Sequence, residues 1–181
     1  MQVSTDKTVC RLSASLAGLQ AGMLAVLWML AWMGSSAVWQ RRSFWTAENL
    51  LASTFYGSAA LQPGFSGHTM SGLALYLLVY SILGCLLAAV FRLTLPPARL
   101  VLVSIAIAVG WYFLSFHVIW KMASPLIPLL HSERPTLLGH VIYGAVLARF
   151  PRYLPAAIGA PRVAASGEGE PEVSASRTES A

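Results

Sequence analysis

The stretch SGHTMSGLALYLLVYSILGCLLAAVF, residues 66–91, decides the class of this protein. Its 26 residues include no Asp, Glu, Lys or Arg. An α-helix rises about 1.5 Å per residue, so about 20 apolar residues cross the hydrocarbon core of a bilayer. A run of this length is difficult to bury inside a soluble domain of this size. The stretch therefore predicts a membrane-spanning helix.

The composition of the whole chain agrees with a membrane protein. Hydrophobic residues make up 56% and charged residues 10%, whereas soluble domains carry about 25% charged residues. The net charge of +5 comes from basic residues that stand mostly at the ends of apolar runs, where topology signals occur. The sequence shows no basic helix and no basic patch interleaved with aromatic residues, so we expect a lipid bilayer as partner and no nucleic acid.

Three further apolar runs bring the expected number of spans to four. The sequence predicts an all-α integral membrane protein, a four-helix transmembrane bundle with spans at 12–38, 66–91, 100–120 and 136–150. The fourth is short, about 22 Å of helix, and needs snorkelling or local thinning of the bilayer. A cleaved secretory signal is the alternative for the first run, but signal cores usually hold about 7–15 residues.

Basic residues near the ends of the spans indicate the orientation. Four spans place both termini on one side with six basic residues, and the other side carries four. The positive-inside rule then predicts cytoplasmic termini, and we expect the inner membrane of a bacterium. Residues 1–11 form a cytoplasmic segment, 12–154 the membrane domain and 155–181 a tail that is too polar to fold. The six basic residues on the side of the termini are Lys7, Arg11, Arg92, Arg99, Arg149 and Arg152, and the four on the opposite side are Arg41, Arg42, Lys121 and Arg134.

The segment 43–64 is too polar to span and too apolar for an ordinary loop. We expect a short helix in the outer interface, with Thr46 as its N-cap. Its apolar face holds Ala47, Leu50, Leu51, Thr54 and Phe55, and Glu48, Asn49 and Ser53 lie on the other side. The alternative is a lid over a cavity.

One short pattern, Gly-His-x-x-x-Gly, occurs twice, at Gly67–Gly72 and at Gly139–Gly144. Each copy opens an even-numbered expected span. The chain is therefore interpreted as two tandem helical hairpins, in which the first and third spans run outward and the second and fourth return.

Small residues predict where the helices touch, because helices in lipid associate through close backbone approach and polar contacts. Gly18 and Gly22 form a GxxxG step in the first span. We expect packing within the bundle there; a homodimer or another membrane protein on this face is the alternative. The glycines of the repeated pattern are the other expected packing positions: Gly67, Gly72, Gly139 and Gly144.

The histidines of the repeat, His68 and His140, allow two hypotheses of function. In the first, both form hydrogen bonds between helices of a non-enzymatic bundle that serves packing, assembly or partner binding. In the second, both ligate a b-type haem or a transition metal, beside Trp111, Tyr112 and Phe116.

A small transporter or channel subunit is a further alternative. However, the expected spans carry no charged residue at mid-depth, where ion pathways usually show one. We expect no catalytic residues, because no nucleophile stands paired with a base. We also expect no resident cofactor and no zinc site, since no zinc-binding spacing occurs.

Overall fold

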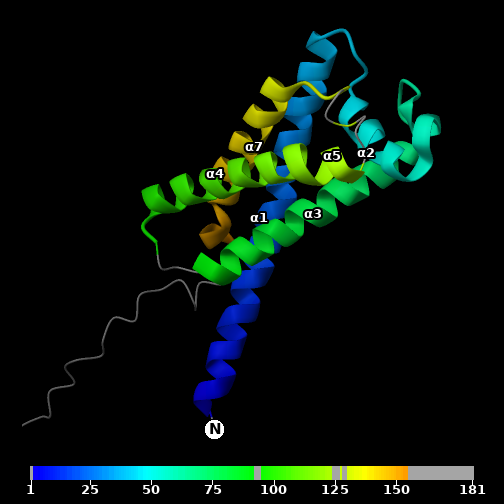
Figure 1. Ribbon diagram of the computed structural model, residues 1–181. Coiled ribbons are helices and arrows are strands. Elements are labelled where there is room, and N and C mark those ends of the chain that lie inside the picture. The colour runs from blue at the N-terminus through cyan, green and yellow to red at the C-terminus, as the bar shows by residue number, and fades with distance from the viewer. Residues whose placement is uncertain (1, 92–94, 124–126, 128–129, 155–181) are drawn as a thin grey trace, which may run out of the picture.

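The computed structural model describes residues 2–91, 95–123, 127 and 130–154, with side chains from Leu12 onward. Every regular element among these residues is helical (Figure 1). The expected tail, 155–181, lies outside the described residues. The elements are α1 (Gln2–Trp39), α2 (Thr46–Tyr56), the 3₁₀ turn η1 (Gly57–Leu61), α3 (Gly67–Phe91), α4 (Pro97–Leu114), the π-helical turn η2 (Ser115–Ile119), α5 (Trp120–Ala123), α7 (Glu133–Leu147) and the 3₁₀ turn η3 (Phe150–Tyr153).

α1 packs along α3 through small residues. A Cβ atom placed on Gly18 would collide with Ala88 and with the carbonyl oxygen of Gly84. One placed on Gly22 would lie 2.9 Å from the carbonyl oxygen of Tyr80. The GxxxG step therefore lies against α3 of the same chain, and Gly84, which the sequence analysis passed over, is its partner.

The outward faces of α1 and α3 carry large apolar side chains. On α3 these form a row at every fourth position: Leu78, Ile82, Leu86 and Val90, all exposed. On α1 the buried positions include Ala14, Ala17, Ala21 and Ala25, whereas Leu16, Leu27 and Trp28 are exposed. Small residues inside and large apolar residues outside are what a lipid environment favours.

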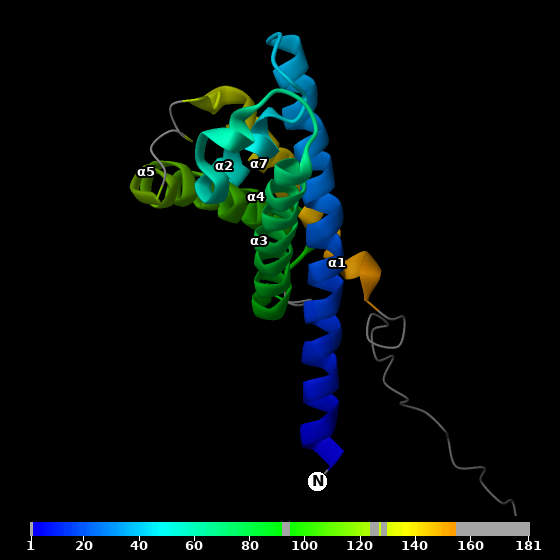
Figure 2. The same cartoon turned by 90° about the vertical axis from the view of Figure 1, so that its right-hand side faces the viewer.

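Among the described residues, three helices are long and apolar enough to cross a membrane: Leu12–Trp39, Gly67–Phe91 and the continuous helix Pro97–Ala123. The expected bundle of four spanning helices is not confirmed, because α7 has 15 residues, about 22 Å of helix. Figures 1 and 2 view the molecule from directions 90° apart, and in both α4 and α5 run across the direction of α1. The helices are therefore not four near-parallel rods.

The segment after α1 does form the expected short helix, α2, and Ala47, Leu50 and Leu51 of its expected apolar face are buried. The burial of its other residues differs from the expectation. Glu48 and Asn49 are 1% and 4% exposed, whereas Phe55 is 62% exposed. The reason is contact with α3: a Cβ on Gly72 would collide with the carbonyl oxygen of Glu48. Thr46 begins the helix but is not its cap, because its hydroxyl donates back to the carbonyl oxygen of Ser43 at 2.5 Å.

The glycines of the repeat differ in their surroundings. A Cβ on Gly144 would lie 2.6 Å from the Cα of Ile105, so α7 touches α4 backbone to backbone. A Cβ on Gly139 would lie 3.2 Å from the side chain of Met29 on α1. A Cβ on Gly67 would meet no described atom within 4 Å, so no close contact accompanies this glycine.

Candidate ligand cavity

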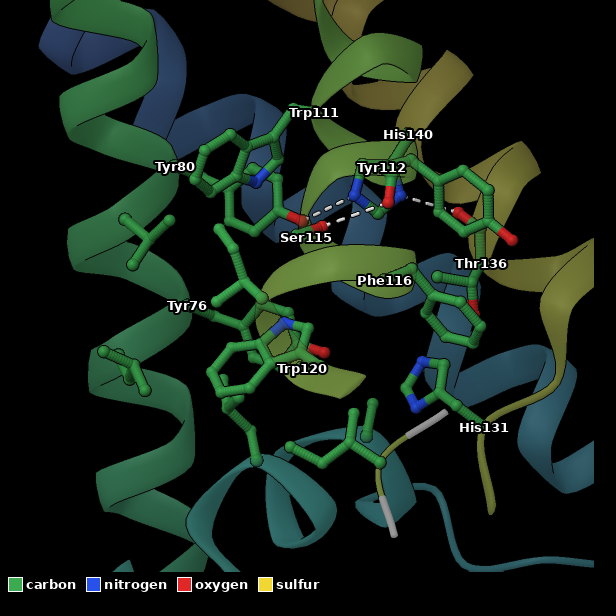
Figure 3. Close-up of a pocket in the computed structure, with 16 residues that line it drawn as sticks. Tyr76, Tyr80, Trp111, Tyr112, Ser115, Phe116, Trp120, His131, Thr136 and His140 are labelled. Atoms are coloured by element: carbon green, nitrogen blue, oxygen red, sulfur yellow. Dashed lines mark hydrogen bonds between the residues drawn. The ribbon is translucent and has the colours of Figure 1, made fainter. Parts of the chain in front are cut away.

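A cavity of about 210 Å³ lies between α2, α3, the α4–α5 helix and the start of α7 (Figure 3). For comparison, a cavity of about 150 Å³ in a protein core accommodates benzene. Its walls are largely aromatic and aliphatic. The lining residues are Ala47, Leu51, Leu75, Tyr76, Val79, Tyr80, Trp111, Tyr112, Ser115, Phe116, Ile119, Trp120, Ile127, His131, Thr136 and His140.

The π-helical turn η2 shapes one wall of the cavity. Two rows of lining residues continue through it at intervals of four: Trp111, Ser115, Ile119 and Tyr112, Phe116, Trp120. In an α-helix each step of four residues rotates the side chain by about 40°, so such rows drift off one face. The wider π turn reduces that drift, and π turns often occur at functional sites.

Tyrosine side chains from two helices face the cavity. Tyr76 and Tyr80 stand one turn apart on α3 with their ring centroids 5.9 Å apart and nearly parallel. Tyr112 stacks on Phe116 with a centroid distance of 5.3 Å. Figure 3 shows the rings of both helices around the same space. Flat walls of this kind favour flat or slender apolar ligands.

His140 is 3% exposed and uses both ring nitrogens. Nδ1 lies 2.8 Å from the carbonyl oxygen of Thr136, which can only accept, so Nδ1 carries the proton. Nε2 then accepts from the hydroxyl of Tyr80 at 2.6 Å. Tyr143 donates to the backbone carbonyl oxygen of Tyr80, also at 2.6 Å. This network joins α7 to α3.

His68, by contrast, lies at the start of α3 and is half-buried. Its ring packs on that of Tyr56 with a centroid distance of 4.7 Å. His68 and Tyr80 are 12 residues apart on one helix, about 18 Å along its axis. Because His140 is bonded to Tyr80, the structure does not bring the two histidines together. Two nitrogens that ligate one metal ion lie within about 4 Å of each other, so these two cannot share an iron in this arrangement.

His131 lies just before α7 and lines one end of the cavity. Its ring meets that of Phe116 with a centroid distance of 6.1 Å. Burial, the positive charge of Arg42 and the neighbourhood of His140 lower the pKa of His131 to about 4. The imidazole is therefore neutral at pH 7.

α2 forms part of the cavity wall through Ala47 and Leu51, and a polar cluster holds this helix in place. The side-chain amide of Asn49 donates to the carbonyl oxygens of Gln62 and Gly64 at 3.0 and 2.9 Å. Its oxygen accepts from the hydroxyl of Thr69 at 2.6 Å. Thr69 in turn accepts from the backbone N–H of Ser66, half of a capping box at the start of α3. This cluster explains why the polar face of α2 points inward.

Glu48, the neighbour of Asn49, is buried differently. Its Oε2 has no hydrogen-bond partner among the described residues. Desolvation raises the pKa of the Glu48 carboxyl to about 7, and a bond from its own backbone acts in the opposite direction. A buried carboxyl without a cationic partner favours the protonated form.

Sequence reasoning identified part of this site. Trp111, Tyr112, Phe116 and His140 line the cavity, whereas His68 does not. Tyr76 and Tyr80 were missed, although a signal exists: two phenols at i, i+4 in an otherwise aliphatic span need hydrogen-bond partners and mark one face. Among the described residues, no group of three or more His, Cys, Asp or Glu side chains is placed to hold a metal ion.

No family model, no curated protein and no solved structure matches this chain.

Proposed function

We propose that this protein binds a small apolar molecule, without transforming it, in the cavity between α2, α3, α4–α5 and α7. The observation that carries the proposal is a cavity of about 210 Å³ whose walls come from four parts of the chain and are largely aromatic and aliphatic. Well-packed helices leave few such voids, and ligand sites are concave, mostly apolar and marked by a few polar groups.

Two polar side chains in the wall, His140 and Ser115, are engaged by the protein itself, which supports binding over catalysis. Both nitrogens of His140 are engaged by Thr136 and Tyr80, and the hydroxyl of Ser115 donates to the carbonyl oxygen of Tyr112 at 3.2 Å. A general base needs a lone pair directed at its substrate. These groups instead stabilise the wall, so the non-enzymatic packing role expected for His140 and the binding role of the cavity are compatible.

We propose the bacterial inner membrane as the setting, with four crossings and both termini in the cytoplasm. Ser132 bonds to Gln40 at 2.6 Å, and the indole of Trp32 donates to the carbonyl oxygen of Pro135 at 3.0 Å. The start of α7 therefore lies beside the end of α1, and α7 runs back along it (Figure 1). Reporter fusions after residue 154 test this: an external signal would contradict the return of α7 to the cytoplasm.

The binding proposal is tested with a fluoronaphthyl methanol, a flat neutral probe, titrated against the detergent-solubilised full chain and followed by fluorine NMR. Val79 lines the cavity, and Val79→Trp fills it. Leu78, the next residue, is 58% exposed on the outer face, so Leu78→Trp is the matched control.

We expect Val79→Trp to weaken binding by about tenfold or more, a difference of about 1.4 kcal/mol. Leu78→Trp should leave the affinity unchanged. Equal signals from all three proteins would show that the probe only partitions into micelles, and the proposal would then be wrong.

A further inference from the structure

A second, much smaller hollow of about 30 Å³ lies beside the apolar cavity. Ala47, His131 and Thr136 line both spaces, so they form the boundary between them. The small hollow also touches Arg42, Gln40 and Ser132. A water molecule needs about 10–15 Å³ measured in this way, so the hollow has room for a group about as large as a carboxylate.

Arg42 gives this end of the cavity its charge. It is half-buried, three residues after the end of α1 at Trp39. Within the described part of the chain, Arg42 forms no ion pair with a carboxylate. His131, which faces the same hollow, is neutral at pH 7 because its pKa is lowered to about 4. A guanidinium that forms no ion pair among the described residues, in a hollow beside an apolar cavity, is a recognition group for an anion.

We propose that the molecule bound here is an amphiphilic carboxylic acid, with its apolar body in the large cavity and its carboxylate on Arg42 in the small hollow. This inference rests on the proposed binding function and adds the chemical class of the ligand. The apolar cavity would hold the apolar body of such a molecule, and the adjacent hollow offers the cation for its carboxylate.

The position of Arg42 in the membrane supports the same orientation. It follows directly on a helix long and apolar enough to cross the bilayer, Leu12–Trp39. Arginines at the ends of spans lie at headgroup depth. A ligand held by Arg42 would therefore keep its acid at the interface and its apolar part below it, as an amphiphile lies in the lipid itself.

The test compares two probes that differ only in the head, a fluoronaphthoate and the fluoronaphthyl methanol. Both are titrated at pH 7.5, where the naphthoate is ionised, into the full chain and two variants. Arg42→Gln removes the charge at the hollow. Arg41→Gln is the matched control, because Arg41 is its exposed neighbour and lies outside the lining of both spaces.

We expect the unchanged protein and Arg41→Gln to bind the naphthoate about tenfold more tightly than the methanol. Arg42→Gln should lose this preference and keep its affinity for the methanol, which also shows that the variant is folded. If Arg42→Gln retains the preference, or if the unchanged protein has none, the acid site is overturned while the cavity proposal stands. If Val79→Trp changes the affinity for neither probe, both proposals fail.

Discussion

The two Gly-His-x-x-x-Gly segments have the same fixed residues and opposite surroundings. His140 is enclosed and bonded at both nitrogens, whereas His68 is half-buried against the ring of Tyr56. They also differ in position within their helices. Gly67 is the first residue of α3, but α7 begins at Glu133, about two turns before His140. The expectation that both copies open a helix holds for the first copy only.

The second glycine of each copy is the point where they agree. Gly72 and Gly144 both allow a backbone to approach so closely that a Cβ would not fit. The neighbour is α2 in the first case and α4 in the second. A repeated short pattern thus provides the same small surface twice, and the element that packs on it decides what the adjacent histidine does.

The largest effect is expected where the two copies agree. Gly72→Ala and Gly144→Ala should each destabilise the protein by about 3 kcal/mol, because the added methyl meets backbone that cannot rotate away. Unfolding by a harsh detergent, followed by circular dichroism, measures the free energy.

Gly110→Ala on α4 is the control for this pair, since a Cβ there meets no described atom within 4 Å. It should be neutral or slightly stabilising. If Gly110→Ala costs as much as the other two, helix flexibility and not close packing explains the loss.

The second prediction concerns Glu48, whose backbone packs against Gly72 of the first copy. The folded protein raises the pKa of Glu48 from 4.5 to about 7. Well below pH 4.5 the Glu48 carboxyl is protonated in both the folded and the unfolded state, so its ionisation does not change the stability. Between pH 4.5 and about 7 the unfolded chain releases the proton and the folded chain keeps it. The free energy of unfolding therefore falls by up to about 3 kcal/mol as the pH rises through this range, and it levels off above about pH 7.

Glu48→Gln should flatten this part of the stability profile. Both proteins are unfolded at a series of pH values from 4 to 8, and the difference between the two curves isolates Glu48. An identical slope in both would contradict the raised pKa.

The histidines themselves test the contrast directly. His140→Ala should cost about 1–2 kcal/mol, the upper range for hydrogen bonds between membrane helices, because the hydroxyl of Tyr80 loses its acceptor. His68→Ala should cost less than about 0.5 kcal/mol, as expected for a half-buried residue. The two losses should add, since the residues share no partner; coupling above about 1 kcal/mol would mean that they lie closer than the structure shows.

The smallest effect is expected at the first glycine of the first copy. Gly67→Ala should stabilise the protein by about 0.5 kcal/mol, because the methyl enters open space and alanine favours the helix. A clear loss of stability in the same unfolding assay would restore a packing role for Gly67.

The sequence predicted the elements whose signal is local. The uncharged run at 66–91 coincides with α3 to within one residue. The small residues Gly18 and Gly22 mark a helix contact because lipid offers no other way to bring backbones together. Trp111, Tyr112 and Phe116, which the sequence suggested only as neighbours of a haem or metal, line the cavity.

Other features depended on which elements meet. Glu48 and Asn49 were placed away from the apolar face of the predicted helix, yet both are buried, and Asn49 finds its partners in Gln62, Gly64 and Thr69. No local pattern contains that information, since hydrogen bonds between residues 13 to 20 positions apart form only once the chain has turned back.

By itself, the sequence determined that this is a helical chain with stretches apolar enough to cross a membrane, because length and hydropathy are properties of each stretch alone. Only the tertiary structure decided that α4 and α5 cross α1, that His140 pairs with Tyr80 while His68 stays apart, and that Arg42 lines a small hollow beside the cavity. A cavity is the space that several packed elements leave between them, so its shape and its charge exist only after they have packed.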